Sequence, residues 1–153
     1  MIYGLAAAVG WGLADFSGAV GTDLALERIL TPATARAREP VNVAFVVTGK
    51  GNVTLWPSPQ VTWPDGARAY PELVEERPET RDGIVRGTKS FGFSLVPDAV
   101  GTLSLPAVAY TYYDLGTRSF RVARVSAMSL PVAEPSGARI RRRIRKIVLD
   151  AAA

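Results

Sequence analysis

Short runs of alternating apolar and polar residues, separated by turn-forming residues, constrain this chain more than any other feature. The clearest run places four large apolar side chains on one face of a strand: Val41, Val43, Phe45 and Val47. Such alternation is typical of a strand with one buried face. The run ends at Gly49-Lys50-Gly51-Asn52, where glycine or asparagine supplies the positive φ of a turn. About seven or eight such strands predict an all-β immunoglobulin-like β-sandwich over residues 22–133.

The remaining strands follow from the same pattern, and no helical period is visible between residues 22 and 136. We expect them, in chain order, over residues 22–30, 53–56, 72–82, 83–96, 103–105, 108–112 and 120–132. The stretch 72–82 is rich in glutamate and is predicted to be a solvated edge strand and loop. Residues 57–71 hold four prolines, which cannot donate to a sheet ladder, so we expect an extended crossing or edge segment there. Asp114-Leu115-Gly116 is expected to form a hairpin-like turn.

An almost continuously apolar segment opens the chain, with Asp15 as the one charged residue among residues 1–20. Its length is about that of a membrane-spanning helix, which needs ~20 residues. We therefore expect an apolar N-terminal helix that spans the membrane or directs export. The alternatives are a secretory signal, although its positive n-region is missing, and a helix buried in the core. The run from Ile2 to Phe16 resembles the first helix of EamA-type drug/metabolite transporters, but no later stretch resembles their other helices, so transport is not inferred.

The C-terminal residues carry the basic character of the chain. Residues 139–153 hold six of the 18 basic groups and one of the 14 acidic groups, so residues 1–138 have a net charge of −1. Because the body is near neutral, we do not expect a nucleic-acid interface. Apolar residues at helical spacing oppose the arginines: Ile140, Ile144, Ile147 and Val148. We expect a basic amphipathic helix over residues 137–150, which meets a membrane surface or an acidic partner through residues 139–148. The alternatives are a solvated helix docked on the sandwich and a frayed terminus.

The chain has no cysteine and no histidine. These absences exclude disulfides, cysteine zinc sites and Ser-His-Asp catalysis, so we expect a protein that is not an enzyme and holds no cofactor or metal. A carboxylate pair about 5–10 Å apart would be the remaining catalytic option, as in glycoside hydrolysis. The candidates are Glu72, Glu75, Glu76 and Glu79. A glutamate run beside arginines is more typical of a solvated face, and we favour that interpretation.

Aromatic residues suggest an alternative function as a carbohydrate-binding β-sandwich module. Six rings are candidates for a stacking platform: Trp56, Trp63, Tyr70, Tyr110, Tyr112 and Tyr113. Rings in a sandwich more often fill the core or cover an edge, and we favour that assignment.

An ordered series of residues resembles the BatD family of bacterial aerotolerance (oxygen-tolerance) membrane proteins. The series covers roughly residues 23–132 and runs through Arg38-Glu39-Pro40-Val41, Gly49-Lys50-Gly51-Asn52, Pro64-Asp65-Gly66, Tyr70-Pro71, Gly83, Gly87, Leu95-Val96-Pro97, Gly101, Leu105-Pro106 and Tyr112-Tyr113-Asp114. It departs from the family at Arg38, where glycine is usual, at Leu115, where proline is expected, and at Phe120, which is often tyrosine. The motif residues that we single out are Gly49, Gly51, Asn52, Pro97, Gly101, Tyr112 and Asp114.

The resemblance implies tandem immunoglobulin-like domains on the outer face of the cytoplasmic membrane, anchored by a transmembrane helix. In that family the genes usually lie beside those of MoxR-type ATPases and von Willebrand factor A proteins. It therefore implies a non-catalytic scaffold at the bacterial inner membrane, with the sandwich in the periplasm and von Willebrand factor A-type membrane proteins as partners. Two departures stand out, because the family's C-terminal membrane helix is replaced by the basic residues and residues 1–20 differ from its usual export signal.

Overall fold

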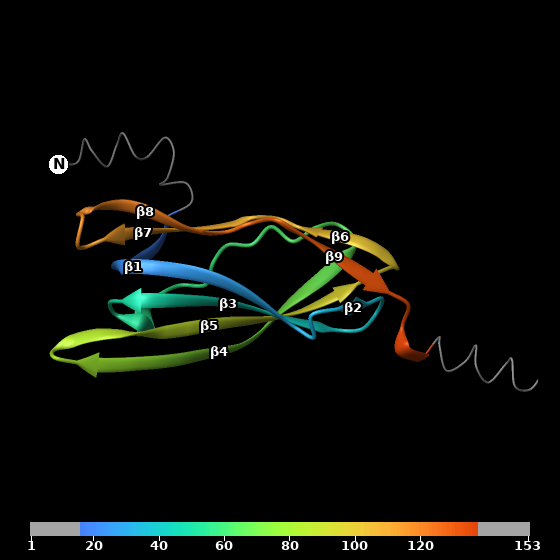
Figure 1. The fold of residues 1–153 in the computed structure, drawn as a ribbon, viewed down its shortest axis with the longest axis horizontal. Helices are drawn as coiled ribbons and strands as arrows, with labels where there is room; N and C mark the ends of the chain where they lie inside the picture. The colour runs from blue at the N-terminus through green and yellow to red at the C-terminus, as the bar shows by residue number, and fades with distance from the viewer. Residues whose placement is uncertain (1–15, 138–153) are drawn as a thin grey trace, which may run out of the picture.

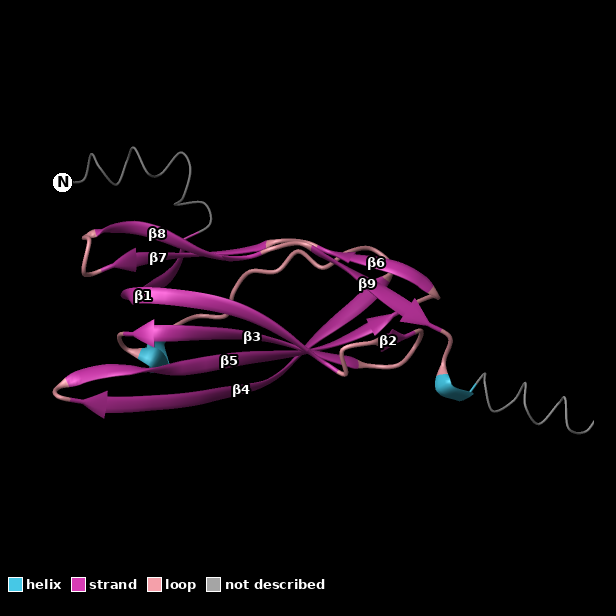
Figure 2. Ribbon diagram, viewed as in Figure 1, coloured by secondary structure: helices cyan, strands magenta, loops and turns pink. Residues whose placement is uncertain are grey.

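The computed structural model describes residues 16–137 of the 153-residue chain, and these residues form two β-sheets. Figures 1 and 2 show the strands running along the long axis of the molecule. The strands are β1 (Phe16–Thr31), β2 (Ala35–Arg36), β3 (Val41–Lys50), β4 (Ala67–Arg81), β5 (Ile84–Pro97), β6 (Gly101–Leu105), β7 (Val108–Asp114), β8 (Ser119–Val125) and β9 (Met128–Ala133). A short 3-10 helix, η2 (Val53–Leu55), follows β3. The expected all-β fold with two sheets is confirmed.

The larger sheet has six strands in the order β4-β5-β3-β1-β7-β8. Its pairs are antiparallel except for β1 with β7. The smaller sheet has the order β2-β9-β6, with β2 parallel to β9. The smaller sheet lies at one end of the molecule, and the β4–β5 hairpin reaches the other end (Figure 1). The hairpin therefore extends beyond the region where the two sheets face each other.

The core sits on the face of β3 that the alternation predicted. Val41, Val43, Phe45 and Val47 are each at most 1% exposed. The first core cluster joins this face to the smaller sheet through Leu105, Leu130 and Val132. Trp63, from the segment before β4, packs edge-on against Phe45 with their ring centroids 6.2 Å apart. Burial of these side chains is the main favourable contribution to the fold.

A second core cluster fills the half of the large sheet that the small sheet does not cover. Val53 of η2 and the adjacent Trp56 are each 1% exposed in this cluster, and its other members all come from strands of the large sheet. The segment that contains Val53 and Trp56 was expected to be a short strand over residues 53–56, and that prediction is wrong. One turn of helix suits this segment because it caps the sheet face instead of extending the ladder.

The chain passes from one sheet to the other between β6 and β7 and again between β8 and β9, and the second of these passages corrects another expectation. Residues 120–132 were predicted to form one strand, but β8 and β9 belong to different sheets. The neighbouring break at Pro106, which separates β6 from β7, was predicted. Arg28 of β1 binds both crossing points, because its guanidinium donates to the carbonyl oxygens of Pro106, at 2.9 Å, and of Ser126, at 2.5 Å. Partial burial lowers the pKa of Arg28 from its ordinary value.

The expected edge strand is confirmed at β4, and so is the long strand β5 beside it. β4 is the outermost strand of the large sheet, and 13 of its 15 residues are exposed. It tolerates Pro71 and Pro78, which an inner strand could not accommodate without losing ladder hydrogen bonds. A register shift between Pro71 and Val74 bends the strand where it leaves the region covered by the small sheet.

The predicted N-terminal helix over residues 1–20 is wrong for residues 16–20, which belong to β1. Ala19 is fully buried and pairs with Tyr112 of β7, and Val20 pairs with Tyr113. A continuous apolar run fits a buried strand as well as a helix, so the period alone did not separate them. Residues 1–15 lie outside the described part of the chain, and so do residues 138–150 of the expected basic helix. Across residues 16–137, no helix is long and apolar enough to span a membrane.

Candidate interaction surfaces

The structure brings most of the motif residues to one end of the large sheet, around an irregularity in β1. The register of β1 against β3 shifts between Thr22 and Ala25. The Gly49–Asn52 turn lies on one side of this bulge and the Asp114 turn on the other, because β1 pairs with both β3 and β7. The amide of Leu115 donates to the carbonyl of Gly21 at 2.9 Å, which fixes the second turn to the bulge.

Gly51 has a geometric reason to be glycine. Its φ is +140°, a conformation that other residues rarely adopt, and a Cβ there would lie 3.0 Å from the carbonyl oxygen of Val20. Its amide donates to the Val85 carbonyl at 2.9 Å, and its own carbonyl accepts from Val53. Asn52 then begins η2 through its backbone carbonyl, which accepts from Leu55 at 3.0 Å. These two motif residues thus shape the turn that positions η2.

Asp114 organises the second turn from a fully buried position. Its Oδ1 accepts from the amides of Gly116 and Thr117 at 2.7 and 2.9 Å, and its Oδ2 accepts from the amide of Asp23 at 3.3 Å. Nη1 of Arg121 lies 3.6 Å from Oδ2. These hydrogen bonds, led by that from Thr117, hold the pKa of Asp114 below its ordinary value although burial alone would raise it. A buried carboxylate that accepts hydrogen bonds from three backbone amides stabilises the turn and is poorly suited to donate a proton.

The polar atoms of the buried rings near this end bond to the backbone of other segments. Nε1 of Trp56 donates to the carbonyl of Val20 at 3.0 Å, and the Tyr110 hydroxyl donates to the carbonyl of Pro57 at 2.8 Å. Tyr112 is 3% exposed, and desolvation by burial raises its pKa. The three rings therefore tie together β1, β7 and the segment after η2.

Pro97 and Gly101 lie apart from the other motif residues, at the end near the small sheet. The carbonyl of the buried Pro97 accepts from the amide of Arg38 at 2.7 Å. Gly101 begins β6 opposite Val132. A groove of about 320 Å³ beside Pro97 is lined by Arg38, Arg68 and Tyr70 among others. The seven motif residues thus lie at two separate ends of the molecule and are not gathered into one site.

The six candidate rings do not form a stacking platform. Trp56, Tyr110 and Tyr112 are at most 3% exposed. The ring of Trp63 packs against two phenylalanines, and that of Tyr113 packs against Phe120 at 5.3 Å between centroids. Tyr70 on β4 is the exposed ring of the six, at 51%. One exposed tyrosine gives a sugar little to stack on, so the arrangement favours the core assignment over carbohydrate binding.

The four candidate glutamates lie along β4, and one of them has a cationic partner. Nζ of Lys89 lies 3.2 Å from Oε1 of Glu76 and donates to the carbonyl of Thr54 at 2.8 Å. Lys89 is only 7% exposed, and its ammonium also lies 5.4 Å from the centroid of the Phe91 ring. No pattern in the sequence marks this buried cation, because its partners come from η2 and β4. Its contacts connect η2 to the edge of the sheet.

Apolar side chains are exposed where β4 leaves the covered region. Tyr70, Leu73 and Val74 are 51%, 67% and 48% exposed, and they lie at the register shift in the strand. Tyr70 and Val74 are on opposite faces of the sheet, because their partners Ser94 and Phe91 are three residues apart. We refer to these three residues as the β4 surface. A run of exposed apolar residues on an outer strand is a recurring feature of protein-binding edges.

A second groove, of about 350 Å³, lies across the large sheet beside the bulge in β1. Its lining includes Thr22, Thr48, Lys50, Glu79, Arg86 and Thr88, which come from β1, β3, β4 and β5. Within residues 16–137, no group of three or more acidic side chains is placed to hold a metal ion.

No family model, curated protein or solved structure matches the chain.

Proposed function

We propose that this chain is a non-catalytic, BatD-like protein-binding domain of immunoglobulin-like type. It works as a scaffold on the periplasmic side of the bacterial inner membrane, and its partners are von Willebrand factor A-type membrane proteins. The observation that carries the binding role is the β4 surface, where three apolar side chains are exposed on the outermost strand. The identity of the family, the partner class and the location rest on the ordered sequence series that ends at Asp114.

The strand order supports the immunoglobulin-like assignment. Four neighbouring strands of the large sheet, in the order β1-β3-β5-β4, correspond to the A-B-E-D sheet of that fold, although this sheet continues beyond β1 with β7 and β8. The β2 strand pairs in parallel with β9, the last strand, in the opposite sheet together with β6. The position of strand C is taken by residues 57–64, which contain no strand. Trp63 from this segment nevertheless packs against Phe45 in the core, as a strand C side chain would.

Binding is assigned to the β4 surface because its apolar side chains are exposed and no other described segment covers them. Leu73 buries little surface against the described residues, so a partner that covers it gains free energy that folding has not already used. The edge is poorly suited to pairing with β4 of a second copy, because it carries charged side chains together with Pro71 and Pro78. An apolar surface on a strand that pairs poorly with the same strand of another copy suits a specific protein partner.

A pull-down from bacterial membrane extracts with the full chain as bait tests this function. We expect von Willebrand factor A-type proteins to be enriched over a bait of unrelated sandwich fold. Leu73→Asp should reduce that enrichment about tenfold or more, since it places a charge in the apolar contact. The matched control is Val100→Asp, which changes a residue that is 57% exposed in the turn before β6. Equal enrichment by the unrelated sandwich, or by the Leu73→Asp bait, would refute the proposal.

The location is tested separately by a reporter fused after Gly137, beyond the last described strand. We expect a reporter that is active only in the periplasm to be active, and one that is active only in the cytoplasm to be silent. The reverse pattern would contradict the periplasmic placement without affecting the binding result. A glycan array with the full chain tests the carbohydrate alternative, which the exposure of a single ring does not favour.

A further inference from the structure

Two cations face each other on neighbouring strands, near one end of the large sheet. Lys50 of β3 is the register partner of Arg86 of β5. Like charges directly opposite each other in a sheet repel, so such a pair needs a reason to persist. The same row continues to Thr22 of β1 on one side and Glu79 of β4 on the other. Two rows further along, and therefore on the same face of the sheet, Thr48 lies opposite Thr88.

The charge of these two residues is not balanced by nearby carboxylates. Among residues 16–137, neither Lys50 nor Arg86 has a carboxylate oxygen within 4.0 Å, although Glu79 is the register neighbour of Arg86. The Nε of Arg86 is buried and has no hydrogen-bond partner in the described part of the chain. It is the single buried side-chain nitrogen or oxygen atom in that part of the chain without a partner. Buried N–H groups almost always have an acceptor, so this one sets Arg86 apart from the other described cations.

Two other cations of the same sheet have acceptors within the described part of the chain. The buried Lys89 has both Glu76 and the carbonyl of Thr54, and Arg121 has both Asp23 and Asp114. The fold thus supplies acceptors for these two cations. At Lys50 and Arg86 it supplies a groove of about 350 Å³ instead. The groove is also lined by the hydroxyl-bearing residues Thr48 and Thr88.

From this arrangement, we infer that the groove binds an oxyanion, in the form of a carboxylate, phosphate or sulfate group. Arg86 and Lys50 supply the positive charge, and the hydroxyls of Thr48 and Thr88 donate hydrogen bonds to the remaining oxygens. Asp23, which also lines the groove, is already engaged by Arg121, with Nη1 and Oδ1 3.5 Å apart. The site is independent of the β4 surface and goes beyond the proposed function, since it takes a small anionic group rather than an apolar protein face.

The test is a titration of the full, ¹⁵N-labelled chain with inorganic phosphate at constant ionic strength. Binding is measured by NMR as changes in the amide chemical shifts. Acetate forms a second arm, which separates carboxylate from phosphate as the preferred group. We expect saturable shifts at residues 48–50 and 86–88 with at least one of the two anions. Lys50→Gln should weaken the apparent affinity about tenfold, and Arg86→Gln should weaken it at least as much.

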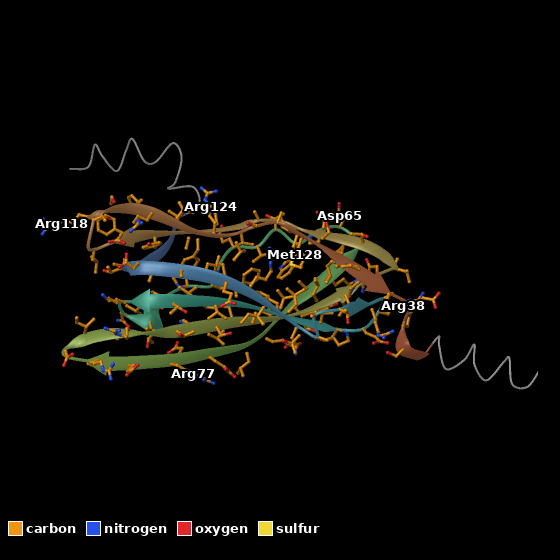
Figure 3. The ribbon with its side chains drawn as sticks, in the orientation of Figure 1. Arg38, Asp65, Arg77, Arg118, Arg124 and Met128 are labelled. Atoms are coloured by element: carbon orange, nitrogen blue, oxygen red, sulfur yellow. The ribbon has the colours of Figure 1, made fainter. Side chains whose placement is uncertain are left out.

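The control is Arg124→Gln, which removes an exposed cation of β8. Figure 3 shows Arg124 on the opposite edge of the molecule from Arg77 of β4. This variant should bind like the unchanged chain. If Arg86→Gln does not fold, Lys50→Gln decides, because Lys50 is exposed and supports no core contact. Shifts that do not saturate with either anion, that spread equally over all arginines, or that saturate at the same anion concentration in Lys50→Gln as in the unchanged chain would overturn the proposal.

Discussion

Replacing Trp56 tests how η2 holds the first strand. The indole is 1% exposed and donates to the carbonyl of Val20, in the segment of β1 where a helix had been expected. Trp56→Phe keeps a ring but removes the donor, which leaves the part-buried carbonyl of Val20 with one partner fewer. Trp56→Ala removes the ring as well and opens a cavity in the second core cluster.

The expected losses follow from these contacts. Loss of the hydrogen bond costs about 1 kcal/mol net, and the volume lost on going from indole to phenyl costs about 1 kcal/mol more. Trp56→Phe should therefore lower the free energy of unfolding by about 2 kcal/mol. Trp56→Ala should lower it by about 3–5 kcal/mol, which is a large part of the roughly 5–15 kcal/mol that a domain of this size has.

Guanidinium chloride unfolding followed by tryptophan and tyrosine fluorescence measures both losses, with an unchanged m-value as the check for two-state behaviour. Amide hydrogen exchange adds a local readout at Leu115, whose N–H bonds to Gly21 in β1. In Trp56→Phe this amide should exchange faster, because the N-terminal part of β1 is held less firmly. If Trp56→Phe is as stable as the unchanged chain and protection at Leu115 is also unchanged, the proposed link between η2 and β1 is refuted.

Gly87→Ala should lower the free energy of unfolding by about 1–3 kcal/mol in a thermal unfolding assay, because a Cβ there would lie 2.2 Å from the backbone oxygen of Arg77. Gly137→Ala is the control, because a Cβ at Gly137 would have nothing within 4 Å. Acid should destabilise the fold through Asp114, because the pKa of this carboxylate is lower in the folded chain than in the unfolded chain. Asp114 therefore contributes its full stabilisation above the ordinary aspartate pKa, and this contribution is lost as the pH falls through the folded pKa. Asp114→Asn should flatten that part of a urea-midpoint against pH curve, and an unchanged acid slope would contradict the assignment. Pro78→Val should promote self-association in sedimentation velocity, since it restores an N–H to an outermost strand, and a strictly monomeric variant would show that the proline does not guard this edge.

Local patterns predicted the elements whose surroundings are set by their own residues. β3 was predicted from Val41 to Val47 because alternation records which face is buried, whatever covers it. β4 was predicted to be an outer strand because its prolines and glutamates are unfavourable in any inner position. The turn at Asp114 was predicted from residue types that hydrogen-bond their own backbone, and the Oδ1 contacts to Gly116 and Thr117 are of this kind.

The predictions that failed depended on partners far away in the sequence. Residues 16–20 form a strand because β7, about ninety residues later, supplies the ladder. Residues 53–55 form a helical turn because an uncovered half of the large sheet needs a cap at that position. The split between β8 and β9 depends on which sheet each half joins, and alternation is the same in both sheets.

For the candidate sites, the sequence determined which residues are available and the tertiary structure decided which of them act together. The absence of histidine and cysteine excluded the chemistry of those side chains. The sequence also contains the apolar residues of the β4 surface, which the fold leaves exposed. The pairing of Lys50 with Arg86, and the burial of Nε without an acceptor, exist only because β3 and β5 align in one particular register. A residue's charge is encoded locally, whereas its countercharge is supplied by whichever strand folds beside it.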